Sequence, residues 1–256
     1  MRTQDFADLY ALEDDLWWFV GMRAISAALL DPVCPLGRDR LVLDVGCGTG
    51  ANLAWLARYA GGGRVIGIDL VSTALGCCRT RGHGRIAQAT ATHLPFADRA
   101  IDLLTGFDVL GHVTGAKADD RALGEVRRVL RPGGITFIRV AAYRWMRSDH
   151  DETLGTHRRY SLGELVDSIE RADLRVVRAT YANTLLLPIA AVRRLVLRRV
   201  GLAAGGSDVR PLPPRLRWLD RALAVALGAE ARYLRHPRAT LRAGLSAICI
   251  AQAPRR

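Results

Sequence analysis

The sequence predicts an α/β fold built around a mostly parallel sheet with helices on both faces. Short apolar segments of strand length alternate with longer helical patterns through the first 180 residues, which is typical of βαβ units. Half of the 256 residues are hydrophobic, enough for one large domain with an insertion. A glycine-rich turn directly after the first apolar strand indicates where such a sheet would approach a ligand.

Seven strands are expected, each a short apolar run bounded by turn residues. The first, Leu41–Val45, has the continuous apolar character of a buried parallel strand. The other six are expected at Arg64–Asp69, Arg85–Ala89, Ile101–Gly106, Gly134–Ala141, Arg175–Tyr181 and Leu245–Gln252.

The first helix is expected from about Leu16 to Leu30, with Asp14 or Asp15 as its cap and Asp31-Pro32 as its end. The alternation breaks at 182–243, where helical stretches at 184–200 and 215–233 flank a loop rich in glycine and proline. We therefore expect a helical cap at 1–38, an α/β core at 39–181, a basic helical insertion at 182–243, and a final strand and tail at 244–256.

Cysteine usage and the N-terminus indicate a cytoplasmic protein. The five cysteines are scattered and show no metal-ligand spacing, so we expect reduced thiols and no metal site. The N-terminus lacks the basic-then-apolar order of a signal peptide. The apolar run from Leu185 to Val192 is far short of the ~20 residues that a membrane-spanning helix needs.

The net charge of +12 is concentrated at the C-terminal end. Residues 190–256 carry 14 arginines against three acids, whereas residues 1–189 are nearly neutral. This basic region could be a solvated lid or dimer face, a contact with an anionic membrane surface, or a site for nucleic acid. We expect no nucleic-acid partner, because aromatic residues do not interleave with the arginines. A monomer and a homodimer both remain open.

Four motifs follow one another between residues 40 and 140. The first strand runs into Asp44-Val-Gly-Cys-Gly-Thr-Gly50, where glycine at every second position permits a sharp turn. Asp69 ends the second strand, where an acid can accept both ribose hydroxyls of a nucleoside. The third motif combines the segment Leu94-Pro95-Phe96, before the fourth strand, with Asp108-Val-Leu-Gly-His112, after it. The fourth motif is Glu125-Val-Arg-Arg-Val-Leu-Arg-Pro-Gly-Gly134.

In this order and spacing, the motifs resemble those of class I S-adenosylmethionine (SAM) dependent methyltransferases, of the type 11 and bacterial small-molecule kind. The resemblance implies a Rossmann-like fold with a seven-stranded sheet, SAM as cofactor and S-adenosylhomocysteine as product. It assigns SAM binding to residues at the strand ends and on the first helix: Asp44, Gly46, Cys47, Gly48, Asn52, Asp69, Leu70, Thr90, Ala91, Phe107 and Arg23.

Two further segments resemble a narrower subgroup of the same family: Leu16-Trp-Trp-Phe-Val-Gly-Met-Arg23, and residues 143–160, which include Gly155-Thr-His-Arg-Arg-Tyr160. They supply candidates for substrate contact, namely Trp17, Trp18, Tyr143, Arg158 and Arg159. The candidates for acid–base catalysis are His112, His150 with Asp151, His157 and Tyr160. The chain departs from the family pattern at Thr90, Gly111 and Thr156-His157, where the family has two acids and a differently placed histidine.

The first functional hypothesis is SN2 methyl transfer from SAM to an oxygen, nitrogen or carbon of a small natural-product or glycan-linked substrate. Holding the acceptor in line behind the methyl group supplies much of the rate, and a base adds about 10²–10⁴-fold. The departures at Gly111 and Thr156-His157 keep a second hypothesis open: a ring-closing enzyme on the same fold, for example one that forms a cyclopropane, which binds SAM or S-adenosylhomocysteine without ordinary methyl transfer. A third is a cofactor-binding partner protein without enzymatic activity.

Overall fold

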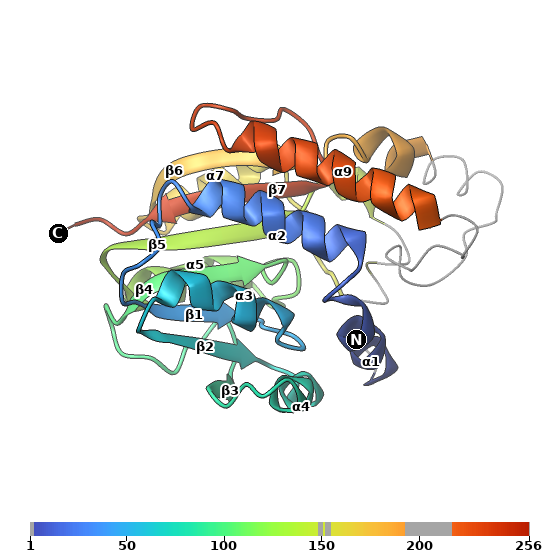
Figure 1. Cartoon of the computed structure of the whole chain (residues 1–256). Helices are drawn as coiled ribbons and strands as arrows, with labels where there is room; N and C mark the ends of the chain where they lie inside the picture. Colours follow the sequence, from blue (N-terminus) through green and yellow to red (C-terminus); the bar gives the residue numbers. More distant parts are fainter. Residues whose placement is uncertain (1–2, 148–150, 152–154, 193–216, 256) are drawn as a thin grey trace.

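The computed structural model describes residues 3–147, 151, 155–192 and 217–255 (Figure 1). Seven strands form one sheet in the order β3-β2-β1-β4-β5-β7-β6. Neighbouring strands from β3 to β5 are parallel, whereas β7 is antiparallel to both β5 and β6. The predicted α/β class and mostly parallel seven-stranded sheet are therefore confirmed.

Every predicted strand is present, with small differences at the ends. The strands are β1 (Leu41–Val45), β2 (Arg64–Asp69), β3 (Ile86–Gln88), β4 (Ile101–Phe107), β5 (Leu130–Ala141), β6 (Arg175–Ala182) and β7 (Ser246–Gln252). The start of β5 was predicted four residues too late. Leu130 already pairs with Ile101, before an irregularity shifts the register to Leu103 and Ile135.

The helices are α1 (Thr3–Leu12), α2 (Trp17–Leu30), α3 (Ala51–Ala60), α4 (Ser72–Thr80), α5 (Ala118–Val129), α7 (Leu162–Arg171) and α9 (Arg217–Leu234). Helix α1 was not predicted. The predicted cap of α2 is wrong, because Leu16 occupies the N-cap position without a side-chain hydrogen bond. Asp14 instead pairs with Arg81 at the end of α4. Of the helical stretch predicted at 184–200, residues 184–186 form a turn, residues 187–192 are helical, and residues 193–200 lie outside the described residues.

Helices cover both faces of the sheet, and the strands alternate their side chains between the two layers. Val42, Leu103 and Phe137 face the layer that contains α2, α3 and α9. Their chain neighbours, such as Leu43 and Leu104, face the layer that contains α5 and α7. Figure 1 shows α2 and α9 side by side across the first of these faces.

The two helices from opposite ends of the chain pack very closely. A Cβ on Gly21 of α2 would collide with the side chain of Leu227 of α9, so glycine is needed at this crossing. No helix within the described ranges is both long and apolar enough to cross a membrane.

Candidate active site at the carboxyl edge of the sheet

The glycine turn after β1 leaves its backbone open to a ligand. Gly46 and Gly48 both adopt a positive φ, +67° and +56°, which disfavours a side chain. A Cβ on Gly46 would also collide with Val109, whereas a Cβ on Gly48 would meet no heavy atom within 4 Å. The space on the Cβ side of Gly48 is therefore open at the edge where β1, β2 and β4 end.

Asp69, at the end of β2, is oriented by two backbone amides. Its Oδ2 accepts from the N–H of Gly48 at 2.9 Å, and its Oδ1 accepts from the N–H of Val71 at 2.9 Å. Each carboxylate oxygen can accept a further hydrogen bond. The next side chain, Leu70, is 65% exposed. A fixed acceptor pair beside an exposed apolar side chain suits a ribose carrying a planar base.

Asp44 lies beneath the glycine turn and is 1% exposed. The hydroxyl of Thr105 on β4 donates to its Oδ1 at 2.6 Å. Burial raises the pKa of Asp44 to about 7, and the Thr105 hydrogen bond opposes that rise. This carboxyl group is therefore poised to change its charge near neutral pH.

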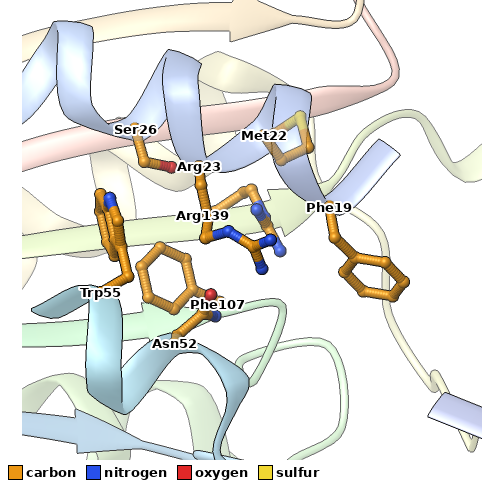
Figure 2. A pocket seen from close by; sticks show the side chains of 8 residues that line it. All are labelled: Phe19, Met22, Arg23, Ser26, Asn52, Trp55, Phe107 and Arg139. Carbon is orange, nitrogen blue, oxygen red and sulfur yellow. The ribbon is translucent and has the colours of Figure 1, made fainter. Parts of the chain in front are cut away.

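A small cavity of about 20 Å³, room for about one water molecule, lies between α2, α3 and the ends of β4 and β5. Its lining residues, shown in Figure 2, are Phe19, Met22, Arg23, Ser26, Asn52, Trp55, Phe107 and Arg139. Within the described part of the chain, the buried Oγ of Ser26 has no hydrogen-bond partner. The cavity thus combines two guanidinium groups, an amide and an unsatisfied hydroxyl.

Arg139 is the buried charge of this cavity, at 7% exposure. Its Nε and Nη2 donate to Oδ2 of Asp108 at 2.9 and 2.6 Å. The rings of Trp18 and Phe107 lie 5.3 and 5.1 Å from its guanidinium carbon, which adds cation–π attraction. Asp108 has a φ of +65°, a conformation held by this ion pair at the end of β4.

The corner between α1 and α2 closes over the glycine turn. Thr49 donates its hydroxyl to the carboxylate of Glu13, and burial raises the pKa of Glu13. Arg81 pairs with both Glu13 and Asp14. Arg23, predicted to bind the cofactor, lines the cavity and also donates to the backbone oxygens of Glu13 and Asp14, each at 2.8 Å. In this structure Arg23 holds the corner together.

His112 follows β4, and its ring is fixed in one tautomer. Nδ1 lies 3.0 Å from the backbone oxygen of Gly155. A carbonyl oxygen can only accept, so Nδ1 of the neutral ring carries the proton and Nε2 has the free lone pair. His112 is half-buried, so this geometry suits a general base.

The segment that follows Gly155 packs directly against Gly111, the position where the family pattern has a glutamate. The N–H groups of His157 and Arg158 both donate to the oxygen of Gly111, at 2.7 and 3.1 Å. A Cβ on Gly111 would lie 2.8 Å from the oxygen of Arg158 and 3.2 Å from Cγ2 of Thr156. The glutamate expected here from the family pattern would not fit, so the two departures compensate for each other.

Three residues predicted to be functional are structural. Arg159 is 8% exposed and donates to both carboxylate oxygens of Asp151, at 2.8 and 3.1 Å. Asp151, at 2% exposure, is the other half of this buried ion pair, and its predicted companion His150 lies outside the described residues. Tyr160 is fully buried, with its hydroxyl 3.4 Å from the oxygen of Leu110. These side chains cannot touch a substrate, because they are enclosed by protein.

The other residues predicted to contact the methyl acceptor, or to take up its proton, lie on the surrounding loops and on α2. Arg158 pairs with Asp119 and lies over the ring of Tyr160, while His157 is exposed. Trp17 and Trp18, on α2, are half-buried and pack against the hydrophobic core between the sheet and the layer of α2, α3 and α9. Tyr143 has a φ of +59° and stacks on the rings of Trp145 and Tyr181.

The remaining predicted cofactor contacts lie along the same edge of the sheet. The Thr90 hydroxyl lies 3.1 Å from that of Thr92, and Ala91 between them is half-buried. Sγ of Cys47 lies 3.9 Å from Sγ of Cys78, so the Cys47 side chain points toward α4. Asn52 and Phe107 line the cavity described above.

Sequence reasoning missed Arg139, Ser26 and Glu13. An arginine inside the apolar strand Ile135–Val140 was a usable signal, because a buried charge needs a partner. Ser26 and Glu13 gave none, since their importance depends on how the first helices fold back over the turn.

Comparison with known proteins identifies the domain. Residues 43–138 match a family model described as a methyltransferase domain. The chain carries a class I SAM-dependent methyltransferase domain. Its cofactor is SAM, and the open backbone at Gly48 together with the Asp69 acceptors fits a bound nucleoside.

The relatives of this methyltransferase domain match it over limited lengths. The chain is 37% identical over 100 residues to Methyltransferase GfsG of Streptomyces halstedii, covering 36% of this chain and 34% of that protein. The chain therefore spans about a third of that relative.

Solved structures share the fold of the methyltransferase domain. The [4+2]-cyclase SpnF has a TM-score of 0.55 at 24% identity, over 90% of this chain and 80% of that chain. Phosphoethanolamine N-methyltransferase 2 of Haemonchus contortus, solved with SAM, has a TM-score of 0.55 at 16% identity, over 99% of this chain and 60% of that chain.

Proposed function

We propose that this protein is a methyltransferase that transfers the methyl group of SAM to an oxygen, nitrogen or carbon of a small molecule, such as a natural-product or glycan-linked intermediate. The observation that carries the proposal is the Asp69–Gly48 contact. It fixes the Asp69 carboxylate beside the glycine turn, next to the open space on the Cβ side of Gly48. The domain match supports the same cofactor.

This chain's own residues would divide the binding work. Asp69 would accept from ribose hydroxyls, and Leu70 would cover one face of the base. Arg139, Ser26 and Asn52 line the cavity beside α2 with donors, and a water molecule in that cavity would bridge them to the carboxylate of SAM. SAM supplies an activated methyl group on its sulfonium, so the protein needs mainly to align an acceptor and take up a proton.

His112 is the proposed base. The carbonyl of Gly155 fixes the proton on Nδ1, so Nε2 can receive the proton of the acceptor atom. Because His112 follows β4 and its position does not depend on Asp69, changing it should affect methyl transfer more than cofactor affinity. This separation distinguishes a base from a residue that only shapes the site.

The activity is tested by incubating the full chain with methyl-labelled SAM and a panel of phenols, alcohols and amines. A product that has gained one CH₂ and retains all three labelled hydrogens of the SAM methyl group supports methyl transfer, because forming a cyclopropane would lose one of them. A substrate that is isomerised without gaining label would favour the ring-closing alternative; the [4+2]-cyclase SpnF shares the fold.

Two variant pairs test the assignments. Asp69→Asn should weaken S-adenosylhomocysteine binding in calorimetry by more than tenfold, since a hydrogen bond to a charged group contributes about 1.5–3 kcal/mol. Asp98→Asn, at an exposed acid, is its control.

His112→Gln should lower kcat by about 10²–10⁴-fold and leave calorimetric affinity unchanged, with the exposed His93→Gln as control. Equal kcat in the His112 and His93 variants would exclude His112 as the base.

A further inference from the structure

The outward side of α9 exposes apolar side chains that nothing in the described part of the chain covers. Trp218, Val225 and Tyr233 are 65%, 71% and 54% exposed. Their spacing of seven and eight residues places them along one side of the helix. The opposite side carries Leu227 and Leu234, which are fully buried against the sheet layer. Helix α9 is thus apolar on two sides.

A second exposed apolar row lies beside α9. Ile189 and Val192 are 64% and 61% exposed and lie three residues apart on one side of the helical segment 187–192, and Leu185, in the turn just before it, is 53% exposed. This segment is joined to α9 by Glu230, whose carboxylate accepts from the N–H groups of Asn183 and Thr184. We call the two rows together the α9 face: Leu185, Ile189, Val192, Trp218, Val225 and Tyr233.

The α9 face holds a large share of the exposed apolar surface. Twelve large apolar side chains are exposed within the described residues, and six of them belong to this face. A patch of this kind marks an interaction site, because single exposed apolar residues are normally scattered.

The charge around the α9 face has one sign. Exposed arginines flank it on α9 and on the turn that follows: Arg221, Arg232, Arg235, Arg238 and Arg242. The two acids of α9 turn away from solvent, since Glu230 is 5% exposed and Asp220 is half-buried. A partner for this face must therefore offer both apolar contact and negative charge.

We propose that the α9 face docks on the surface of an anionic lipid bilayer. Tryptophan and tyrosine are suited to the boundary between headgroups and acyl chains, and the arginines would meet the negative headgroups. A second copy of this chain would bring arginine against arginine. Nucleic acid would meet four aliphatic side chains, on which bases do not stack, and the two aromatic residues Trp218 and Tyr233 lie about 22 Å apart along α9, too far for a continuous stacking platform.

Vesicle co-sedimentation of the full chain tests the proposal and needs no methyl acceptor. The probes are vesicles of phosphatidylcholine alone and of equal parts phosphatidylcholine and phosphatidylglycerol. We expect sedimentation with the anionic vesicles at about 0.1 M salt, loss of most binding at about 0.5 M salt, and none with the neutral vesicles.

Paired variants assign the binding to this face. Trp218→Ser with Val225→Ser should reduce the fraction of protein that sediments with anionic vesicles, because it removes apolar contact with the bilayer. Trp145→Ser with Val177→Ser changes exposed apolar residues elsewhere and is the control. Arg232→Gln with Arg235→Gln should lower the partition coefficient about thirtyfold. Arg79→Gln with Arg85→Gln removes the same charge from another surface and should leave binding unchanged. Unfolding curves check that each variant is folded.

Three outcomes overturn the proposal. The first is no sedimentation with anionic vesicles. The second is vesicle binding that the α9-face variants leave intact, which would place the contact elsewhere on the chain. The third is concentration-dependent dimerisation, or binding to a labelled RNA oligonucleotide, that the α9-face variants abolish while vesicle binding stays unchanged.

Discussion

Replacing Asp44 with asparagine should change how the stability of this domain depends on pH. Asp44 is buried beneath the glycine turn, and its pKa is raised to about 7 by burial. Asparagine has the same shape and keeps an oxygen that can accept from Thr105. The substitution therefore removes the titration and preserves the packing.

The magnitude follows from the pKa difference between the folded and unfolded states. The ordinary pKa of an aspartate is 3.8, so the pKa of Asp44 rises by roughly three units on folding. At 1.36 kcal/mol per unit, the protonation of Asp44 contributes about 4 kcal/mol to the free energy of unfolding. Because the folded pKa is raised, this contribution is fully present below pH 3.8 and is lost as the pH rises through 7. Above pH 7 the charged carboxylate destabilises the folded state by that amount.

Urea unfolding of the wild type and of Asp44→Asn at pH values from 4 to 8 measures this effect. The variant should gain stability relative to the wild type as the pH rises, by about 1.4 kcal/mol per pH unit between pH 4 and 7. Asp98→Asn, at an exposed acid, should run parallel to the wild type. A constant difference between wild type and Asp44→Asn across this range would refute the reasoning.

Three further substitutions probe contacts between distant parts of the chain. Gly111→Ala should destabilise by about 1–3 kcal/mol in urea unfolding, since its Cβ meets the oxygen of Arg158. Gly124→Ala, in open space on an exposed part of α5, should stabilise by about 0.5–1 kcal/mol, and equal effects would contradict the packing argument. Gly21→Ala should lower Tm, and adding Leu227→Ala should cost less than the sum of the two single changes; strict additivity would argue against their contact. Arg81→Ala should free α1 and increase its proteolysis in the apo protein, and unchanged cleavage would show that the pairs with Glu13 and Asp14 do not hold it.

The strands of this fold could be predicted from the sequence because each is a short apolar run between turn residues. The match at β1 and β2 extends to their end residues. Helix α1 was missed because its alternating acidic and apolar residues have a weak pattern, and its contacts with α4 come from distant sequence. The wrong cap of α2 has the same origin, since Arg81 attracts Asp14 away from the helix start.

The candidate site divides in a similar way. Glycine spacing and the acid after β2 predicted Gly48 and Asp69, because close approach and ribose recognition require those residue types. Sequence could not tell which charged residues near residue 155 are exposed. The sequence predicted functional roles for Arg159 and Asp151, yet the two side chains form an ion pair inside the protein.

The sequence by itself determined the fold class, the cofactor domain and the concentration of positive charge near the C-terminus, because these depend on local pattern and composition. Only the tertiary structure decided that Arg139 enters the site, that Gly111 must lack a side chain, and that α9 turns its acids inward. Those outcomes depend on which segments meet in space. Burial and charge pairing then decide whether a polar side chain binds a ligand or supports the fold.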